Sequence, residues 1–185
     1  REIGMTQMGV ATLSGKTQNG TTTSEIVKAA ADEYNRIAEV AAKAGIQQFL
    51  HDEGFEMARV DGRLVYEMLL ELLDPKLVKM QFQMSAMPVV GDPVMYFEKY
   101  PGRFISMHLQ GVTQSPAANG SSSASQAVAS ARPGTGNPPV PLGKDSVDWP
   151  KVFRAARTGG VKNYFVEQNW DIAVQSVSYL KTLNV

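Results

Sequence analysis

Residues 77–84 read LVKMQFQM, and their alternation decides the fold class. A period of two is typical of a β-strand, in which successive side chains point to opposite faces. Lys79, Gln81 and Gln83 therefore share one face, and the methionines and Phe82 share the other. The apolar face is expected to pack under helices. The polar face suits a barrel interior or an active-site floor, because an ordinary apolar core does not tolerate two amides and an ammonium group.

Helix-like and strand-like segments alternate on both sides of this strand. Apolar periodicity, N-cap residues and turn residues set their boundaries. The predicted strands span residues 5–10, 46–51, 77–84, 104–109 and 164–167, and the predicted helices span residues 24–44, 64–73, 93–100, 148–159 and 172–183. Such alternation predicts an α/β fold with a parallel sheet and right-handed crossovers. Five βα units fit either a small open sheet or five-eighths of a (β/α)8 barrel.

Composition and charge exclude several classes of function. The 185 residues, enough for one domain, carry 18 basic and 18 acidic side chains, so no basic field exists to hold nucleic acid or an anionic membrane surface. Without cysteine, disulfides, thiolate nucleophiles and Cys-ligated zinc are excluded, and any metal has to be held by His, Asp, Glu or amide oxygens. Apolar runs fall short of a membrane span, and the sequence fits a cytoplasmic or an exported location equally.

Residues 113–141 interrupt the alternation with a low-complexity loop of Ser, Ala, Gly, Pro, Asn and Gln within the single domain 1–185. Such a composition cannot bury enough apolar surface to order itself. The loop follows the end of a predicted strand, which is where α/β proteins keep their ligands. It is interpreted either as a tolerated surface loop or as a lid, and Arg132 is its one residue with chemistry to offer.

Polar side chains gather at or near the ends of four predicted strands. His51, Gln83, His108 and Glu167 hold these places, and the carboxyl ends of parallel strands converge on one ligand site. Glu167 follows three residues of a buried strand, so its charge costs several kcal/mol unless it is paired or bound to a metal. The structural alternatives are a hydrogen-bonded half-buried His108, Gln83 as a polar filler and a solvated loop at residues 51–53.

Seven short motifs occur in a fixed order: HDEGFEM (51–57), DPKLVK (74–79), DP (92–93), KYPGR (99–103), HL (108–109), VDW (147–149) and YFVEQ (164–168). In order and spacing this series resembles the C-terminal two-thirds of the sugar phosphate isomerase/epimerase family, the xylose-isomerase-like TIM barrels. The resemblance covers nearly the whole chain apart from the insertion. It implies a (β/α)8 barrel of which about the last five βα units lie in this chain and the first three lie outside it.

The resemblance also implies a divalent cation, Mn, Mg, Co or Zn, at the barrel mouth. His108 matches the family's histidine ligand, and Glu167 matches its last-strand carboxylate ligand. Gln83 stands where members usually have an aspartate, and Gln110-Gly111 replaces the family's Lys-Asp pair. An amide oxygen binds Mg²⁺ or Mn²⁺ without supplying charge, so Glu53 is expected to provide the missing ligand charge or the general base.

The family's chemistry assigns roles to the remaining polar residues. Catalysis is expected from Glu53, Glu167 and His51, substrate binding from Gln83, Lys79 and Trp170, and metal binding from His108, Glu167 and Glu53. Trp170 could stack on a sugar ring, or it could belong to the core.

The function implied is a metal-assisted isomerase, epimerase or lyase acting on a sugar or keto-sugar derivative. The metal would polarise a carbonyl while a carboxylate removes the neighbouring carbon-bound proton. The alternative is a degenerate, metal-free barrel that serves as a carbohydrate-binding or non-catalytic subunit. An apurinic endonuclease of the same barrel type would need a basic groove and more than two histidines. A small-molecule sugar is the expected partner, with no nucleic acid or membrane, and a homo-oligomer or a missing N-terminal barrel segment would close the exposed sheet edges.

Overall fold

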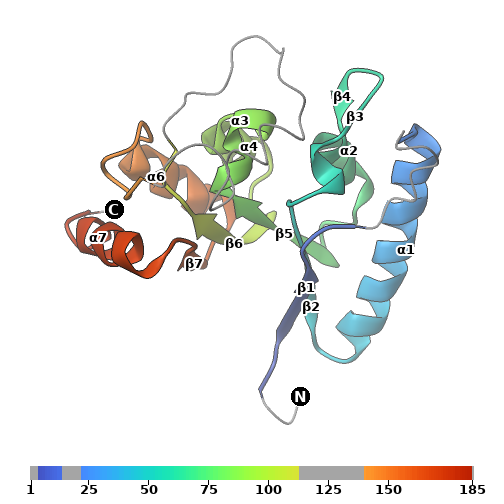
Figure 1. The fold of residues 1–185 in the computed structure, drawn as a ribbon. Helices are drawn as coiled ribbons and strands as arrows, with labels where there is room; N and C mark the ends of the chain where they lie inside the picture. Colours follow the sequence, from blue (N-terminus) through green and yellow to red (C-terminus); the bar gives the residue numbers. More distant parts are fainter. Residues whose placement is uncertain (1–3, 14–21, 113–139, 185) are drawn as a thin grey trace. The chain divides into compact units, whose positions relative to one another are not determined.

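The computed structural model describes residues 4–13, 22–112 and 140–184. The chain forms two compact units, residues 1–80 and residues 81–185 (Figure 1). Its main sheet has five strands in the order β1-β2-β5-β6-β7, which is also their order along the chain. Strand β5 (Val78–Gln83) runs across the boundary between the units, with its first three residues in the first unit and its last three in the second.

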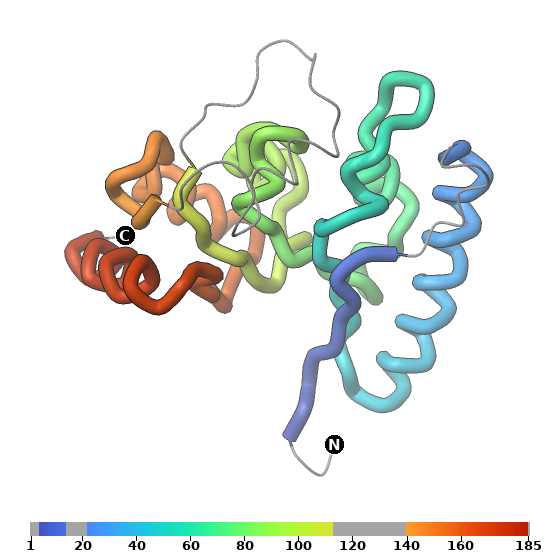
Figure 2. The backbone as a smooth tube through the Cα atoms, in the orientation of Figure 1, coloured from blue at the N-terminus to red at the C-terminus, as the bar shows by residue number. Residues whose placement is uncertain are grey.

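The first unit is built around one βαβ crossover. Strands β1 (Gln7–Val10) and β2 (Gln47–His51) are parallel neighbours, and helix α1 (Ser24–Lys43) connects them and runs alongside (Figure 2). The helix begins where the hydroxyl of Thr23 accepts a hydrogen bond from the N–H of Ile26, as an N-cap residue does. The buried stripe of α1 consists of Val27, Ala31, Tyr34, Ala38 and Ala41. Its three- and four-residue spacing is typical of an amphipathic helix.

A short hairpin after β2 was not predicted from the sequence. A 3₁₀ turn (Phe55–Met57) leads into strand β3 (Arg59–Val60), which pairs antiparallel with β4 (Arg63–Leu64) before helix α2 (Val65–Leu72) begins. Asp61 and Gly62 form the two-residue loop, with φ angles of +49° and +79°. Asp-Gly is a favoured pair for such a loop, because both positions require positive φ.

The second unit continues the alternation of strands and helices. After β5 come a 3₁₀ turn (Met84–Ala86), α3 (Met87–Val90), α4 (Pro93–Lys99), β6 (Phe104–Leu109), α6 (Trp149–Gly159), β7 (Asn163–Val166) and α7 (Trp170–Leu180). Strands β6 and β7 are parallel, with Ser106 opposite Asn163 and Leu109 opposite Val166. The predicted lid or surface loop at residues 113–141 falls almost wholly outside the described residues. None of the helices in the described parts is long and apolar enough to cross a membrane.

An aromatic cluster forms the core of the second unit. Phe82 of β5 is fully buried, and its ring centroid lies 5.4 Å from that of Phe97 and 6.2 Å from those of Tyr96 and Phe104. Edge-to-face pairs of this kind stabilise a core beyond the area they bury. The apolar face of the predicted strand thus packs under helix α4, as the alternation of residues 77–84 indicates.

Phe82 offers a direct test of this core. We expect Phe82→Ala to lower the free energy of unfolding by about 3–5 kcal/mol, because it removes a buried ring and leaves a cavity. Chemical denaturation followed by circular dichroism measures the change. Met95→Ala on the exposed side of α4, where the Met95 residue is 46% exposed, is the matched control and should change stability little. Equal losses in the two variants would contradict this packing.

Candidate active site

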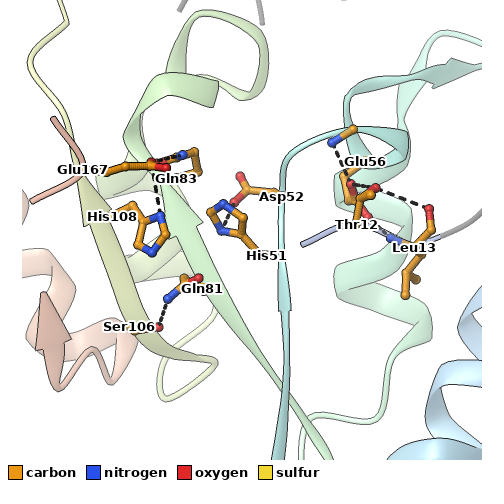
Figure 3. Close-up of polar contacts among 11 residues, drawn as sticks. Thr12, Leu13, His51, Asp52, Glu56, Gln81, Gln83, Ser106, His108 and Glu167 are labelled. Carbon is orange, nitrogen blue, oxygen red and sulfur yellow. Dashed lines mark hydrogen bonds and ion pairs between the residues drawn. The ribbon is translucent and has the colours of Figure 1, made fainter. Parts of the chain in front are cut away.

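Three polar side chains from consecutive strands meet in the second unit (Figure 3). Gln83 ends β5, His108 is the last residue but one of β6, and Glu167 directly follows β7. The side-chain N–H of Gln83 (Nε2) donates to Glu167 Oε2 at 2.6 Å, and His108 Nδ1 lies 3.3 Å from the same oxygen. Sequence reasoning placed all three in one site, and the structure brings these three together.

The three residues of this cluster differ in how far they are exposed to solvent. Gln83 is 3% exposed, whereas the side chain of His108 is 23% exposed and that of Glu167 is 43% exposed. The backbone of Glu167 is fixed because its N–H donates to the carbonyl of Leu109 at 3.0 Å, which extends the pairing of β6 with β7. The Glu167 carboxylate is therefore held by its neighbours and is still accessible to a ligand.

The same face of the strands carries further polar and aromatic support. Gln81, two residues before Gln83, donates through Nε2 to Ser106 Oγ at 2.8 Å. Two residues after Ser106, His108 meets the ring of Phe165 edge-on, with centroids 5.8 Å apart. This is the set of inward-facing residues that period-two alternation predicts for the three strands. Gln81 and Gln83 are each held by a hydrogen bond to another side chain, as buried polar groups require.

His51 is the last residue of β2, and the acidic residues Asp52 and Glu53 follow it in the first unit. His51 and Asp52 are 6% and 1% exposed, so a solvated loop is the wrong description of these two residues. His51 Nδ1 and Asp52 Oδ1 are 3.9 Å apart. Glu53 is only partly exposed. The catalytic roles of His51 and Glu53 remain predictions.

Sequence reasoning missed a fully buried carboxylate, Glu56, in the first unit. Glu56 Oε1 accepts a hydrogen bond from the N–H of Leu13 at 2.7 Å, and Oε2 accepts from the Thr12 hydroxyl at 2.7 Å and from the N–H of Gly54 at 3.1 Å (Figure 3). Thr12 Oγ1 in turn accepts from the N–H of Phe55 at 3.0 Å. The carboxylate therefore ties the segment after β1 to the segment after β2. No local signal in the sequence pointed to it, because its partners Thr12 and Leu13 lie more than forty residues away.

Lys79 and Trp170, the other two expected substrate ligands, have different environments. Lys79 lies at the start of β5, where its Nζ donates to the carbonyl of Pro75 at 3.0 Å, so it is at the opposite end of the strand from Gln83. Trp170 is the first residue of α7 and is 81% exposed, which rules out the core alternative for this side chain. Trp149 has that role, because it is fully buried.

Comparison with known proteins gives matches among solved structures. A sugar phosphate isomerase/epimerase from Parabacteroides distasonis superposes with a TM-score of 0.68 at 22% identity, over 97% of this chain and 58% of that one. The probable 3-DHS dehydratase AsbF from Bacillus anthracis gives 0.65 at 16% identity, over 96% and 64%. A xylose isomerase domain protein from Planctomyces limnophilus gives 0.59 at 16%, over 97% and 58%. The chain has the fold of part of a xylose-isomerase-like TIM barrel. No protein-family model and no curated protein matches the sequence.

The match confirms the resemblance at the level of the fold. The chain spans less than two-thirds of the length of each of these three barrels, and the five strands account for five βα units. In TIM barrels the ligand site lies at the carboxyl ends of the strands. Gln83, His108 and Glu167 occupy such ends on β5, β6 and β7, so the cluster stands where this barrel type places its chemistry.

The donor atoms of the cluster test whether the implied divalent cation fits. His108 and Glu167 offer one imidazole nitrogen and one carboxylate, but Gln83 turns its NH₂ group, which is not a metal ligand, toward the carboxylate. Within residues 4–13, 22–112 and 140–184, no group of three or more His, Cys, Asp or Glu side chains could hold a metal ion. By themselves, Gln83, His108 and Glu167 do not complete a cation site. Glu53, which was expected to supply charge, belongs to the first unit, and its role as a metal ligand stays a prediction.

The protonation of Glu56 gives a pH test of the first unit. Burial raises the pKa of the Glu56 carboxyl above 4.5, against the opposing effect of its hydrogen-bond donors. The folded state thus binds this proton more tightly than the unfolded state, and the stability it contributes is complete below pH 4.5 and lost as the pH rises through the folded-state pKa. We expect the unfolding free energy of the natural protein, minus that of Glu56→Gln, to fall as the pH rises above 4.5.

Glu25 at the start of α1 provides a control of opposite sign. Hydrogen bonds from its own backbone N–H and from Thr23 lower the pKa of the Glu25 carboxyl, so its stabilising effect is present at neutral pH and lost as the pH falls. The same difference, measured with Glu25→Gln by denaturant titration at each pH, should rise with pH. A difference for Glu56 that is flat or rising would show that its carboxyl is not buried as described.

Proposed function

We propose that this chain carries part of the active site of an enzyme that isomerises, epimerises or dehydrates a sugar or keto-sugar derivative by moving a proton next to a carbonyl group. The observation that carries the proposal is the position of an accessible carboxylate, Glu167, at the ends of the barrel strands with Gln83 and His108 on one of its oxygens. Neighbours of the same fold include an isomerase/epimerase and a probable dehydratase, which supports this class of reaction.

Glu167 is the proposed general base. Its carboxylate removes a proton from a carbon next to the substrate carbonyl, and an enediolate forms. Return of the proton to the same carbon from the other side gives epimerisation, return to the neighbouring carbon gives isomerisation, and loss of a hydroxyl group gives dehydration. His108 is the proposed partner that exchanges the proton with the carboxylate, because Nδ1 lies 3.3 Å from Oε2.

The environment of Glu167 suits this role. Proton abstraction needs a carboxylate held in one orientation but reachable by substrate, since a misplaced base loses much of its effect. Gln83 supplies the orientation from a buried position, and the 43% exposure of the Glu167 side chain supplies the access. The metal-assisted form of the reaction rests on the family resemblance alone and takes no support from the donor atoms described above.

A second candidate function is carbohydrate binding without catalysis. The exposed Trp170 favours it, because an indole ring at 81% exposure is available to stack on a sugar face. The neutral Gln83 and the Gln110-Gly111 pair, where the family carries charged residues, point the same way.

Replacement of Glu167 tests the enzyme proposal. In the intact protein we expect Glu167→Gln to reduce proton exchange at least about 100-fold, because the amide cannot act as a base, while the fold persists. The measurement is incorporation of solvent deuterium into a panel of ketoses, aldoses and their phosphates, followed by ¹H NMR. Glu98→Gln, an exposed glutamate on α4, is the matched control and should retain full exchange.

The outcomes separate the two functions. Exchange in the natural protein that disappears in Glu167→Gln supports the enzyme. Undiminished exchange in that variant removes Glu167 from the chemistry. Sugar binding that Trp170→Ala abolishes, with no exchange for any sugar in the panel, favours the non-catalytic carbohydrate-binding protein.

A further inference from the structure

We propose that the Gln83 amide takes the place of a divalent cation in this site, so that Glu167 and His108 are held without a resident metal. This inference rests on the proposed function only in taking Gln83, His108 and Glu167 as the active site. Metal binding can be measured without turnover, so failure of this inference and failure of the proposed reaction are distinguishable.

The direction of the hydrogen bond is the first step. An ionised carboxylate can only accept, so the group of Gln83 that lies 2.6 Å from Glu167 Oε2 has to be its NH₂. An amide binds a hard cation through its oxygen, because the nitrogen lone pair is delocalised. Gln83 therefore turns toward the carboxylate the one end that cannot ligate metal and that can stabilise negative charge.

The fixed position of Gln83 is the second step. The residue is 3% exposed and follows Phe82, whose ring is held in the aromatic cluster with Phe97 and Phe104. A residue whose backbone neighbour is anchored in this way has little freedom to swing aside. The amide is thus a buried part of the site, and a cation that displaced its hydrogen bond to Glu167 would leave a buried donor unsatisfied.

Charge is the third step. Glu167 contributes a carboxylate to the cluster, whereas Gln83 contributes no charge. Affinity for hard divalent cations depends on the number of charged oxygen ligands. Gln83 adds no charged oxygen to those of Glu167, whose Oε2 already accepts a hydrogen bond at 2.6 Å.

The isosteric change Gln83→Glu reverses each of these conditions. It replaces the donor nitrogen by an oxygen without changing the size of the side chain, so two carboxylates would meet at about the present 2.6 Å with the imidazole at 3.3 Å. Two carboxylates this close can both stay charged only if they bind a cation. Without a cation they share a proton. The variant therefore brings three ligating groups together where the natural chain brings two.

The experiment is a titration of the intact protein with Mn²⁺ at neutral pH, after dialysis against chelator and then buffer, read by isothermal calorimetry and by loss of the free Mn²⁺ EPR signal. We expect the natural protein to show no stoichiometric binding up to roughly 1 mM, and Gln83→Glu to bind one Mn²⁺ at least about 10- to 100-fold more tightly. Adding His108→Ala to the variant should remove the gain.

Gln81→Glu is the matched control. Gln81 is a buried glutamine on the same strand and face, but its partner is the Ser106 hydroxyl, so the same added charge should bring no Mn²⁺ binding. Circular dichroism melts verify that each variant is folded at the temperature of the titration. Tight stoichiometric Mn²⁺ binding by the natural protein that Glu167→Gln abolishes would overturn the proposal. A folded Gln83→Glu that binds no better than the natural protein, or no better than Gln81→Glu, would also overturn it.

Discussion

Alternation along β5 is the constraint on which the rest of the second unit depends. Because successive residues of a strand point to opposite faces, anchoring Phe82 among Phe97 and Phe104 forces Gln81 and Gln83 onto the other face. A shift of one residue in register would bury both amides in the aromatic cluster and expose Phe82. The apolar core therefore fixes the polar site, since the same strand supplies both, and the site needs no separate source of rigidity.

The polar residues of that face follow one rule, that a buried polar group requires a partner. Gln81 has Ser106, and Gln83 has Glu167, each at hydrogen-bond distance. The partners come from different strands, so each hydrogen bond also fixes how two segments distant in sequence meet. Loss of one partner would leave a buried amide unsatisfied, which costs more than the hydrogen bond itself contributes. Function and stability are thus linked through the same few atoms.

Sequence alone predicted the regular elements better than the polar contacts. The helix predicted over residues 24–44 matches α1 to within one residue, and residues 104–109 form β6 as predicted, because local capping and alternation determine these features. The Asp61-Gly62 hairpin was missed although its signal is local, since the flanking strands have only two residues each. The Glu56 contacts could not be derived, because Thr12 and Leu13 lie more than forty residues away and nothing local pairs them with it.

Two carboxylates illustrate why exposure, not residue type, decides which side chain can act. Glu56 is wholly buried and accepts hydrogen bonds from two backbone N–H groups and one hydroxyl, and those from Thr12 and Leu13 join two chain segments. Glu167 is nearly half exposed, and its described side-chain contacts converge on a single oxygen, Oε2. Sequence reasoning favoured Glu167 because it expected a buried strand before it, but Tyr164 and Phe165 of β7 are 38% and 50% exposed, and the strand only positions the carboxylate. Its chemistry depends on standing one residue past the strand end, where the backbone is still fixed by β6 and the carboxylate already meets solvent.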